Sequence, residues 1–139
     1  MDEALLAAYR TTDYRVRLAC GGWVTIRIDQ PSPAELRDLA GNLPWGFITA
    51  WNPLSKPLPR PDNRIAQRAL LAALRALLET AVIRPGLAIN RDGSWKEASL
   101  WVVGPGVPAL DALAQRFGQV GYVHGEGTAL AQLRLTPPG

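Results

Sequence analysis

The stretch WGFITAWNPLSKPLPRPDNR, residues 45–64, decides how this chain of 139 residues is interpreted. Its first half is apolar apart from Thr49, which is typical of a central strand that is covered on both sides. The Trp-Asn-Pro triplet at residues 51–53 ends that strand, because proline cannot donate a ladder hydrogen bond and Asn-Pro favours a turn. Four prolines then stiffen the connection to a helix near Asp62, and a rigid polar connection of this kind suggests a pocket wall.

The residues that follow this stretch predict the longest helix of the chain. Leucines recur at helical spacing through DNRIAQRALLAALRALLET, residues 62–80, and Asp62 is the expected N-cap. Two further helices are predicted over residues 32–41, where Ser32 begins a capping box, and over residues 107–118. A short helix is also expected at residues 3–9.

Paired strands are predicted on either side of glycine-containing turns. Alternating apolar residues flank Gly21-Gly22, a second pair of runs flanks Asp92-Gly93, and two short strands surround residues 125–127. The element order is then β-β-α-β-α-β-β-α-β-β. This order predicts a single α+β domain over residues 1–139, with its core at about residues 14–135. We expect a mixed, mostly antiparallel sheet with the helices packed mainly on one face.

The composition is that of a globular protein, with 47% hydrophobic and 19% charged residues. A formal net charge of +3 does not by itself indicate nucleic-acid binding. Cys20 and His124 are the single residues of their types, which excludes an internal disulfide and a Cys- or His-rich metal site. No cofactor-binding fingerprint is present, so no cofactor is expected. The lack of a signal peptide and of a long apolar run predicts a soluble cytoplasmic protein that is not a membrane protein.

Four short motifs together resemble one known family. They are FITAWNP at residues 47–53 with Ser55 after it, Asn63 at the start of the long helix, Trp95-Lys96-Glu97, and RFGQ at residues 116–119. As a set they resemble the bacterial family of uncharacterised proteins known as domain of unknown function 3293. Lys96 stands where the resemblance leads us to expect Pro. The resemblance extends over about residues 14–135, implies one domain, and implies no particular activity.

Polar and aromatic side chains occur where the central strand ends and the long helix begins. The candidate ligand-binding residues are Thr49, Trp51, Asn52, Ser55, Asn63, Arg64, Glu97 and Gln119. An antiparallel neighbour of the central strand brings its own first residues to the Asn52 end. We therefore expect Glu97 and Gln119, which open later strands, to lie near Asn52. Trp51 and Trp95 border polar turns and are the tryptophans expected to line a cleft.

Each of these residues also has a purely structural interpretation. Asn52 is typical of a turn, and Asn63 is typical of a helix start. Glu97 is compatible with an ion pair at a sheet edge, and Gln119 with a bond to the backbone of a nearby loop. His124 is compatible with a half-buried histidine on a strand.

Three functions remain open from the sequence. The first is binding of a polar or anionic, nucleotide-like small molecule in a pocket at the end of the central strand and the start of the long helix, with Arg64 or Lys56 contacting an anion. A catalytic version needs Glu97 or His124 as the acid or base. The second is a nucleic-acid-associated module that uses Arg60, Arg64 and Arg68, which share one helix face. The third is a protein-interaction domain that presents the Pro-rich loop.

Overall fold

The computed structural model describes residues 3–137, and its helices and strands follow the order that the sequence predicts. The elements are α1 (Glu3–Arg10), β1 (Thr12–Arg17), β2 (Trp23–Ile26), α2 (Ala34–Ala40), β3 (Pro44–Ile48), the 3-10 turn η1 (Pro53–Ser55), α3 (Arg60–Ala76), β4 (Val82–Asn90), β5 (Lys96–Val103), α4 (Val107–Arg116), β6 (Gly121–Glu126) and β7 (Gln132–Leu135). Within the described residues, no helix combines the length and the apolar character that crossing a membrane requires.

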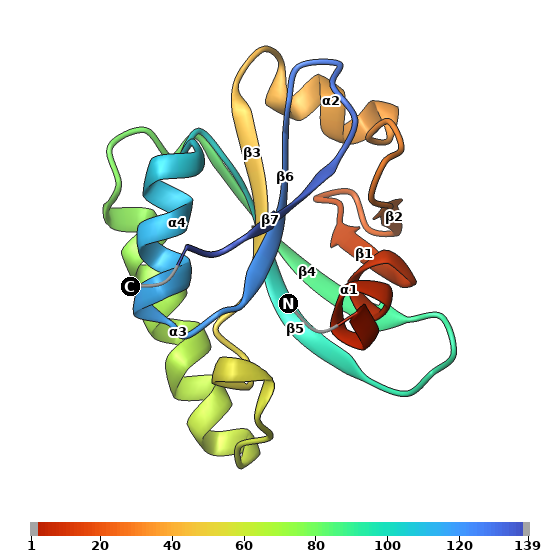
Figure 1. The fold of residues 1–139 in the computed structure, drawn as a ribbon. Coiled ribbons are helices and arrows are strands. Elements are labelled where there is room, and N and C mark those ends of the chain that lie inside the picture. The colour runs from red at the N-terminus through yellow and green to blue at the C-terminus, as the bar shows by residue number, and fades with distance from the viewer. Residues whose placement is uncertain (1–2, 138–139) are drawn as a thin grey trace.

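The strands form one antiparallel sheet in the order β2-β1-β4-β5-β3-β6-β7 (Figure 1). The central strand β3 pairs on one side with β5 and on the other with β6. The sheet is curled, so that the chain leaving β2 meets the chain entering β7. There the Asp29 N–H donates to the Ala131 carbonyl at 2.8 Å, and Pro31 forms a bridge with Leu130. The curled sheet therefore surrounds an interior.

Large side chains fill most of that interior. Because successive residues of a strand point to opposite faces, every second residue of each strand faces inward. Trp45 and Phe47 of β3 and Trp101 and Val103 of β5 belong to this inner core cluster and are buried. Burial of such aromatic and aliphatic side chains is the main force that holds the two edges of the sheet together.

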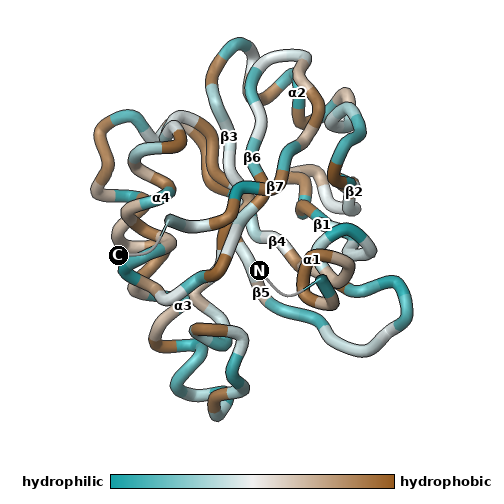
Figure 2. The backbone as a smooth tube through the Cα atoms, viewed as in Figure 1, coloured by the Kyte–Doolittle hydropathy of each residue, from teal (hydrophilic) through white to brown (hydrophobic). Residues whose placement is uncertain are grey.

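The two longest helices cover part of the outer face of the sheet. Leu70 and Leu74 of α3 and Leu110 of α4 pack with the outward residues Ile48 and Val102 of β3 and β5. Figure 2 shows both helices alternating between hydrophilic and hydrophobic residues, as expected for helices with one covered face.

The two shorter helices belong to the interior. Leu36 of α2 and Tyr9 of α1 pack with the inner cluster, and Figure 1 shows α2 at the top of the sheet and α1 lower down beside β1 and β4. The prediction of a single α+β domain with a mostly antiparallel sheet is confirmed. The expected packing of helices on one face describes α3 and α4. The curled sheet also has an interior, and α1 and α2 pack against that interior.

The two predicted helix N-caps are wrong. Helix α2 begins after Pro33 and α3 begins after Pro59, and neither N-cap residue makes a side-chain capping bond. Proline fixes φ near the helical value, and a proline directly precedes each helix in place of a capping hydroxyl or carboxylate. The Ser32 hydroxyl is buried without a partner among the described residues, and Asp62 lies in the first turn of α3, where its charge favours the helix dipole.

Close packing between Trp45 and Gly125, which are partners across β3 and β6, is testable. A Cβ atom at Gly125 would lie 2.6 Å from Cζ2 of Trp45, whereas a Cβ at Gly106 would approach nothing closer than 3.8 Å. We expect Gly125→Ala to lower the free energy of unfolding by about 1–3 kcal/mol, because an overpacked core must shift a rigid indole ring. Urea unfolding of Gly125→Ala and of the control Gly106→Ala measures the two losses of stability. Equal losses for Gly125→Ala and Gly106→Ala would show that the indole moves aside without cost.

Candidate functional site

Glu97 points into the interior of the curled sheet. Side chains alternate along β5, and Trp101 and Val103 belong to the inner core cluster, so Glu97 shares their face. Its partner on β4 is Ala88, whose small buried side chain fills little of the space beside it. A carboxyl group therefore occupies an inward position on the same face where β5 further along carries Trp101 and Val103.

A hollow of about 290 Å³ opens beside Glu97. Its walls come from α1, from the loop that follows β3 and from the hairpin between β4 and β5. The lining residues are Leu5, Ala8, Tyr9, Asn52, Ser55, Pro57, Trp95 and Glu97. A smaller space of about 40 Å³ shares Tyr9, Trp95 and Glu97 with this hollow and is also lined by Thr49 and Gln119. We call the two spaces together the Glu97 pocket.

The side chain of Glu97 is half-buried at this pocket. Burial raises its pKa to about 7, because a charged carboxylate is disfavoured away from water. Within residues 3–137, no hydrogen bond or ion pair compensates that carboxyl group. Burial and then the negative charge of Glu97 raise the pKa of Tyr9 to about 12. Burial is also the main cause that raises the pKa of Tyr14, with a smaller contribution from Glu97.

Asn52 and Asn63 hold the loop after β3 against the start of α3. The side-chain oxygen of Asn63 accepts the backbone N–H of Asn52 at 2.8 Å, and its Nδ2 donates to Oδ1 of Asn52 at 2.7 Å. Oδ1 of Asn52 also accepts the backbone N–H of Leu58 at 3.0 Å. Asn63 is only 1% exposed and does not line the pocket. The structure therefore places Asn63 behind the pocket as a tie, and Asn52 at its wall.

The loop between these ties has an unusual backbone. Asn52, Leu54 and Ser55 have φ values of 47°, 57° and 59°, a left-handed region that residues other than glycine rarely adopt. The N–H of Leu54 donates to the Gly118 carbonyl at 2.7 Å, which holds the turn in place. Such conformations cost free energy and cluster at ligand sites, and both Asn52 and Ser55 line the Glu97 pocket.

Thr49 and Gln119 contact backbone groups near the inner end of the pocket. The Thr49 hydroxyl donates to the carbonyl of Ala98 at 2.7 Å and accepts the N–H of Trp51 at 3.0 Å. Gln119 donates to the carbonyl of Trp51 at 3.2 Å. Gln67, which the sequence analysis missed, accepts a backbone N–H of the same segment at 2.9 Å. These side chains fix the chain that leaves β3, so they shape the pocket as well as lining part of it.

Besides Asn63, three more of the predicted residues do not line the Glu97 pocket. Trp51 and Arg64 line a groove of about 350 Å³ beside α3, on the outer side of the sheet. His124 lines a hollow of about 490 Å³ near the start of α4, which shares no residue with the Glu97 pocket. Burial and then the charge of Arg134 lower the pKa of His124. Glu97 and His124 therefore do not form an acid–base pair. Among residues 3–137, no three His, Cys, Asp or Glu side chains gather closely enough to hold a metal ion.

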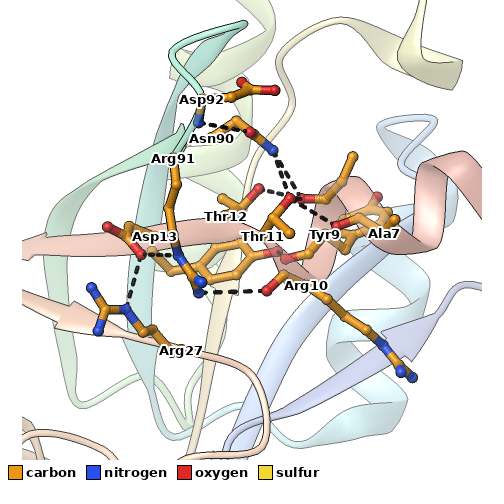
Figure 3. A network of polar contacts seen from close by, with 12 residues as sticks. Ala7, Tyr9, Arg10, Thr11, Thr12, Asp13, Arg27, Asn90, Arg91 and Asp92 are labelled. Carbon is orange, nitrogen blue, oxygen red and sulfur yellow. Dashed lines mark hydrogen bonds and ion pairs between the residues drawn. The ribbon is translucent and has the colours of Figure 1, made fainter.

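The sequence analysis missed Tyr9, which forms an aromatic wall of the pocket together with Trp95. The available signal was the aromatic residue near the end of a short amphipathic helix that directly precedes a strand. The hydroxyl of Tyr14 donates to the Tyr9 carbonyl at 2.7 Å, and Nδ2 of Asn90 donates to the Ala8 carbonyl at 3.2 Å. Figure 3 shows how this polar network joins the end of α1 to β1 and to the hairpin. The network fixes α1 beside Glu97.

Comparisons with known proteins identify a family and no activity. A family model described as "Protein of unknown function (DUF3293)" matches residues 48–121, a little over half of the chain. This match confirms the resemblance drawn from the motifs. The matched range contains Asn52, Asn63, Glu97 and Gln119, but not Tyr9. No significant match to a curated protein or to a solved structure was found.

The paired asparagines make a measurable contribution to stability. We expect Asn63→Ala to lower the free energy of unfolding by about 1–3 kcal/mol, because the N–H of Asn52 loses its partner in a region that water reaches poorly. Asn42→Ala, at an exposed position, is the matched control and should change stability by less than about 0.5 kcal/mol. Thermal unfolding of the two variants gives the comparison. Indistinguishable melting temperatures would mean that Asn63 does not hold the loop.

The raised pKa of Glu97 predicts a defined pH dependence of stability. The unfolded chain loses this proton near the usual value of 4.5, whereas the folded protein keeps it to about 7. The folded state therefore binds more protons between these values, and the stability contributed by protonated Glu97 is lost as pH rises from about 4.5 to about 7. We expect Glu97→Gln to gain stability relative to the wild type over this interval, by on the order of 2 kcal/mol.

Urea unfolding of the wild type and Glu97→Gln at several pH values measures this gain. Glu35→Gln, on the exposed face of α2, is the control for loss of a carboxylate. A difference between Glu97→Gln and the wild type that does not change between pH 4.5 and pH 7 would contradict the raised pKa.

Proposed function

The chain belongs to the DUF3293 family, whose description assigns no activity, and from its own side chains we propose that the Glu97 pocket binds a small polar molecule. The ligand presents a hydrogen-bond donor to the carboxyl group of Glu97 and places a flat apolar part between α1 and the hairpin. The sequence suggests a polar or anionic, nucleotide-like ligand. The proposal here keeps the polar ligand and replaces the anionic group by a group that donates hydrogen bonds, such as the donor edge of a base.

The observation that carries the proposal is the carboxyl group that has no partner. Partial withdrawal of a carboxylate from water costs free energy unless hydrogen-bond donors or a cation compensate it. The described residues supply neither to Glu97, and burial raises its pKa to about 7. A ligand that donates hydrogen bonds to Glu97 supplies the missing interaction. Perturbed carboxyl groups in hollows are more frequent at functional sites than elsewhere.

The rest of the lining indicates the shape of the ligand. Tyr9 and Trp95 offer aromatic surface, and Asn52 and Ser55 offer polar groups at the rim. A volume of about 290 Å³ lies near the lower end of the range for small-molecule pockets, which suits a single ring system with few substituents. Aromatic walls with a few polar groups are typical of sites that bind planar heterocycles.

Charge discriminates between ligand classes. An anionic group beside Glu97 would be repelled whenever the carboxylate is ionised, whereas an amine or amidine would be attracted. Arg64, the expected anion contact, lines a different groove, and Lys56 does not line the Glu97 pocket. The proposal therefore favours donors such as an amino group, an amidine or the N–H edge of a nucleobase.

Benzamidine and benzoate test this choice, because they carry the same ring with a donor group or an acceptor group. We expect benzamidine to raise the melting temperature more than benzoate, because a ligand that binds only the folded state stabilises it. Isothermal titration at pH 8 then gives dissociation constants, and the affinity for benzamidine should fall at least tenfold in Glu97→Gln.

Glu35→Gln is again the control, since it removes a carboxylate on the exposed face of α2. Trp95→Ala should weaken the binding of both benzamidine and benzoate, because it removes an aromatic wall of the pocket and leaves the contact with Glu97 in place. Equal affinities for benzamidine and benzoate, or unchanged affinity in Glu97→Gln, would contradict a donor-binding pocket.

A further inference from the structure

The outer face of β1 carries two arginines. Tyr14 and Val16 are buried in the interior, so Arg15 and Arg17 point to the opposite face of the strand. Arg17 pairs with Trp23 of the neighbouring edge strand β2. In the described residues, α3 and α4 pack in the outer core cluster, over β3, β5 and β6. The outer side of β1 and β2 is therefore a separate, arginine-rich part of the same face.

Trp23 is the centre of this part of the surface. Its side chain is 38% exposed, and the guanidinium carbons of Arg15 and Arg17 lie 5.2 and 5.5 Å from its ring centre. Cations at this distance are attracted to the indole ring, which holds both arginines in place. Positive charge and an aromatic ring are thus combined at one position of the sheet.

Arginine also outnumbers carboxylate at the neighbouring end of β1. Asp13 contacts Arg27 and Arg91, each at 3.0 Å. Figure 3 shows Asp13 between the two arginines. One negative charge faces two positive charges there, so the end of β1 does not cancel the charge of Arg15 and Arg17.

The same face continues across the sheet to α3. Arg15 pairs with Leu87 of β4, and Leu87 pairs with Ala98 of β5, so all three residues share the outer face. Ala98 in turn forms part of the groove of about 350 Å³ beside α3. Three strand spacings separate β2 from β5, which corresponds to about 14 Å along the sheet. The groove and Trp23 are therefore two ends of one continuous surface.

Three arginines and a tryptophan line the groove. Arg60, Arg64 and Arg68 are spaced by four residues on α3, so successive side chains lie about 6 Å apart along the helix. Within residues 3–137, none of the three takes part in an ion pair. Trp51 and the apolar side chains of β5 form the opposite wall.

We propose that single-stranded nucleic acid binds along this face, with its phosphates on the arginines and its bases against Trp51 and Trp23. A guanidinium group matches the geometry of a phosphate, and stacking on aromatic side chains holds unpaired bases without regard to sequence. The regular spacing of the three arginines suits a repeating anion. The continuation of the surface to β2 favours a polymer over a single nucleotide. The site lies outside the curled sheet and is independent of the Glu97 pocket.

Fluorescence anisotropy with a labelled oligothymidylate of about 12 nucleotides tests the proposal. We expect binding that weakens steeply between about 50 and about 200 mM salt, since phosphate contacts release counterions. Arg64→Glu combined with Arg68→Glu should weaken binding at least tenfold. Trp51→Ala should weaken it by about tenfold, because a stacked base loses its platform. Trp23→Ala should weaken binding of the long oligonucleotide more than that of a dinucleotide.

Arg37→Glu combined with Arg116→Glu is the matched control, because it changes the net charge equally at exposed positions outside the groove. It should weaken binding less than threefold. Duplex DNA of the same length and polyglutamate are the competitors. Absence of oligothymidylate binding at low salt would overturn the proposal, as would equal losses for the two charge-reversed pairs. Competition by polyglutamate as strong as by unlabelled oligothymidylate, with Trp51→Ala unchanged, would instead identify a surface for acidic proteins.

Discussion

The curl of the antiparallel sheet is the constraint on which the remaining structure depends. Once the chain after β2 meets the chain before β7, every inward residue of the strands must share one enclosed space. Trp45, Phe47 and Trp101 fill that space through most of its length. Toward α1, the inward positions of β5 are Ser99 and Glu97, which cannot fill it with apolar volume. A hollow with a carboxyl group is the result, and the raised pKa of Glu97 follows from the same geometry.

The loop after β3 turns this hollow into a defined pocket. The reciprocal bonds of Asn52 and Asn63 tie the loop to α3, and the bond from Leu54 to Gly118 ties it to the segment that enters β6. These contacts offset the free-energy cost of the left-handed backbone conformation of the turn. The prolines limit the alternatives available to the unfolded chain. Ligand recognition on this account depends on the rigid pocket wall that this loop forms. Trp51 of the same loop lines the groove beside α3 on the outer face of the sheet.

Much of the fold is predictable from sequence because its signals are local. Two turns with glycine, a strand ended by Asn-Pro and a leucine pattern at helical spacing predicted the element order. The reasoning that an antiparallel neighbour brings Glu97 to the end of β3 also follows from strand direction alone. The curl was not predictable, since it depends on contacts between residues near Asp29 and Ala131, which are far apart in the chain. For the same reason the sequence did not assign α1 and Tyr9 to the pocket, and it placed Arg64 with Glu97 although the sheet separates them.

The most direct test of this account is an NMR titration of the Glu97 side-chain carboxyl carbon in the folded wild-type protein, assigned by comparison with Glu97→Gln. A carboxyl group of this interior face without a partner should titrate at about 7, well above the usual value of 4.5 for a glutamate. Addition of benzamidine should lower that pKa, because a donor stabilises the ionised form. A pKa for Glu97 near the usual 4.5 would show that the carboxyl group is solvated or already paired, and would contradict the central claim.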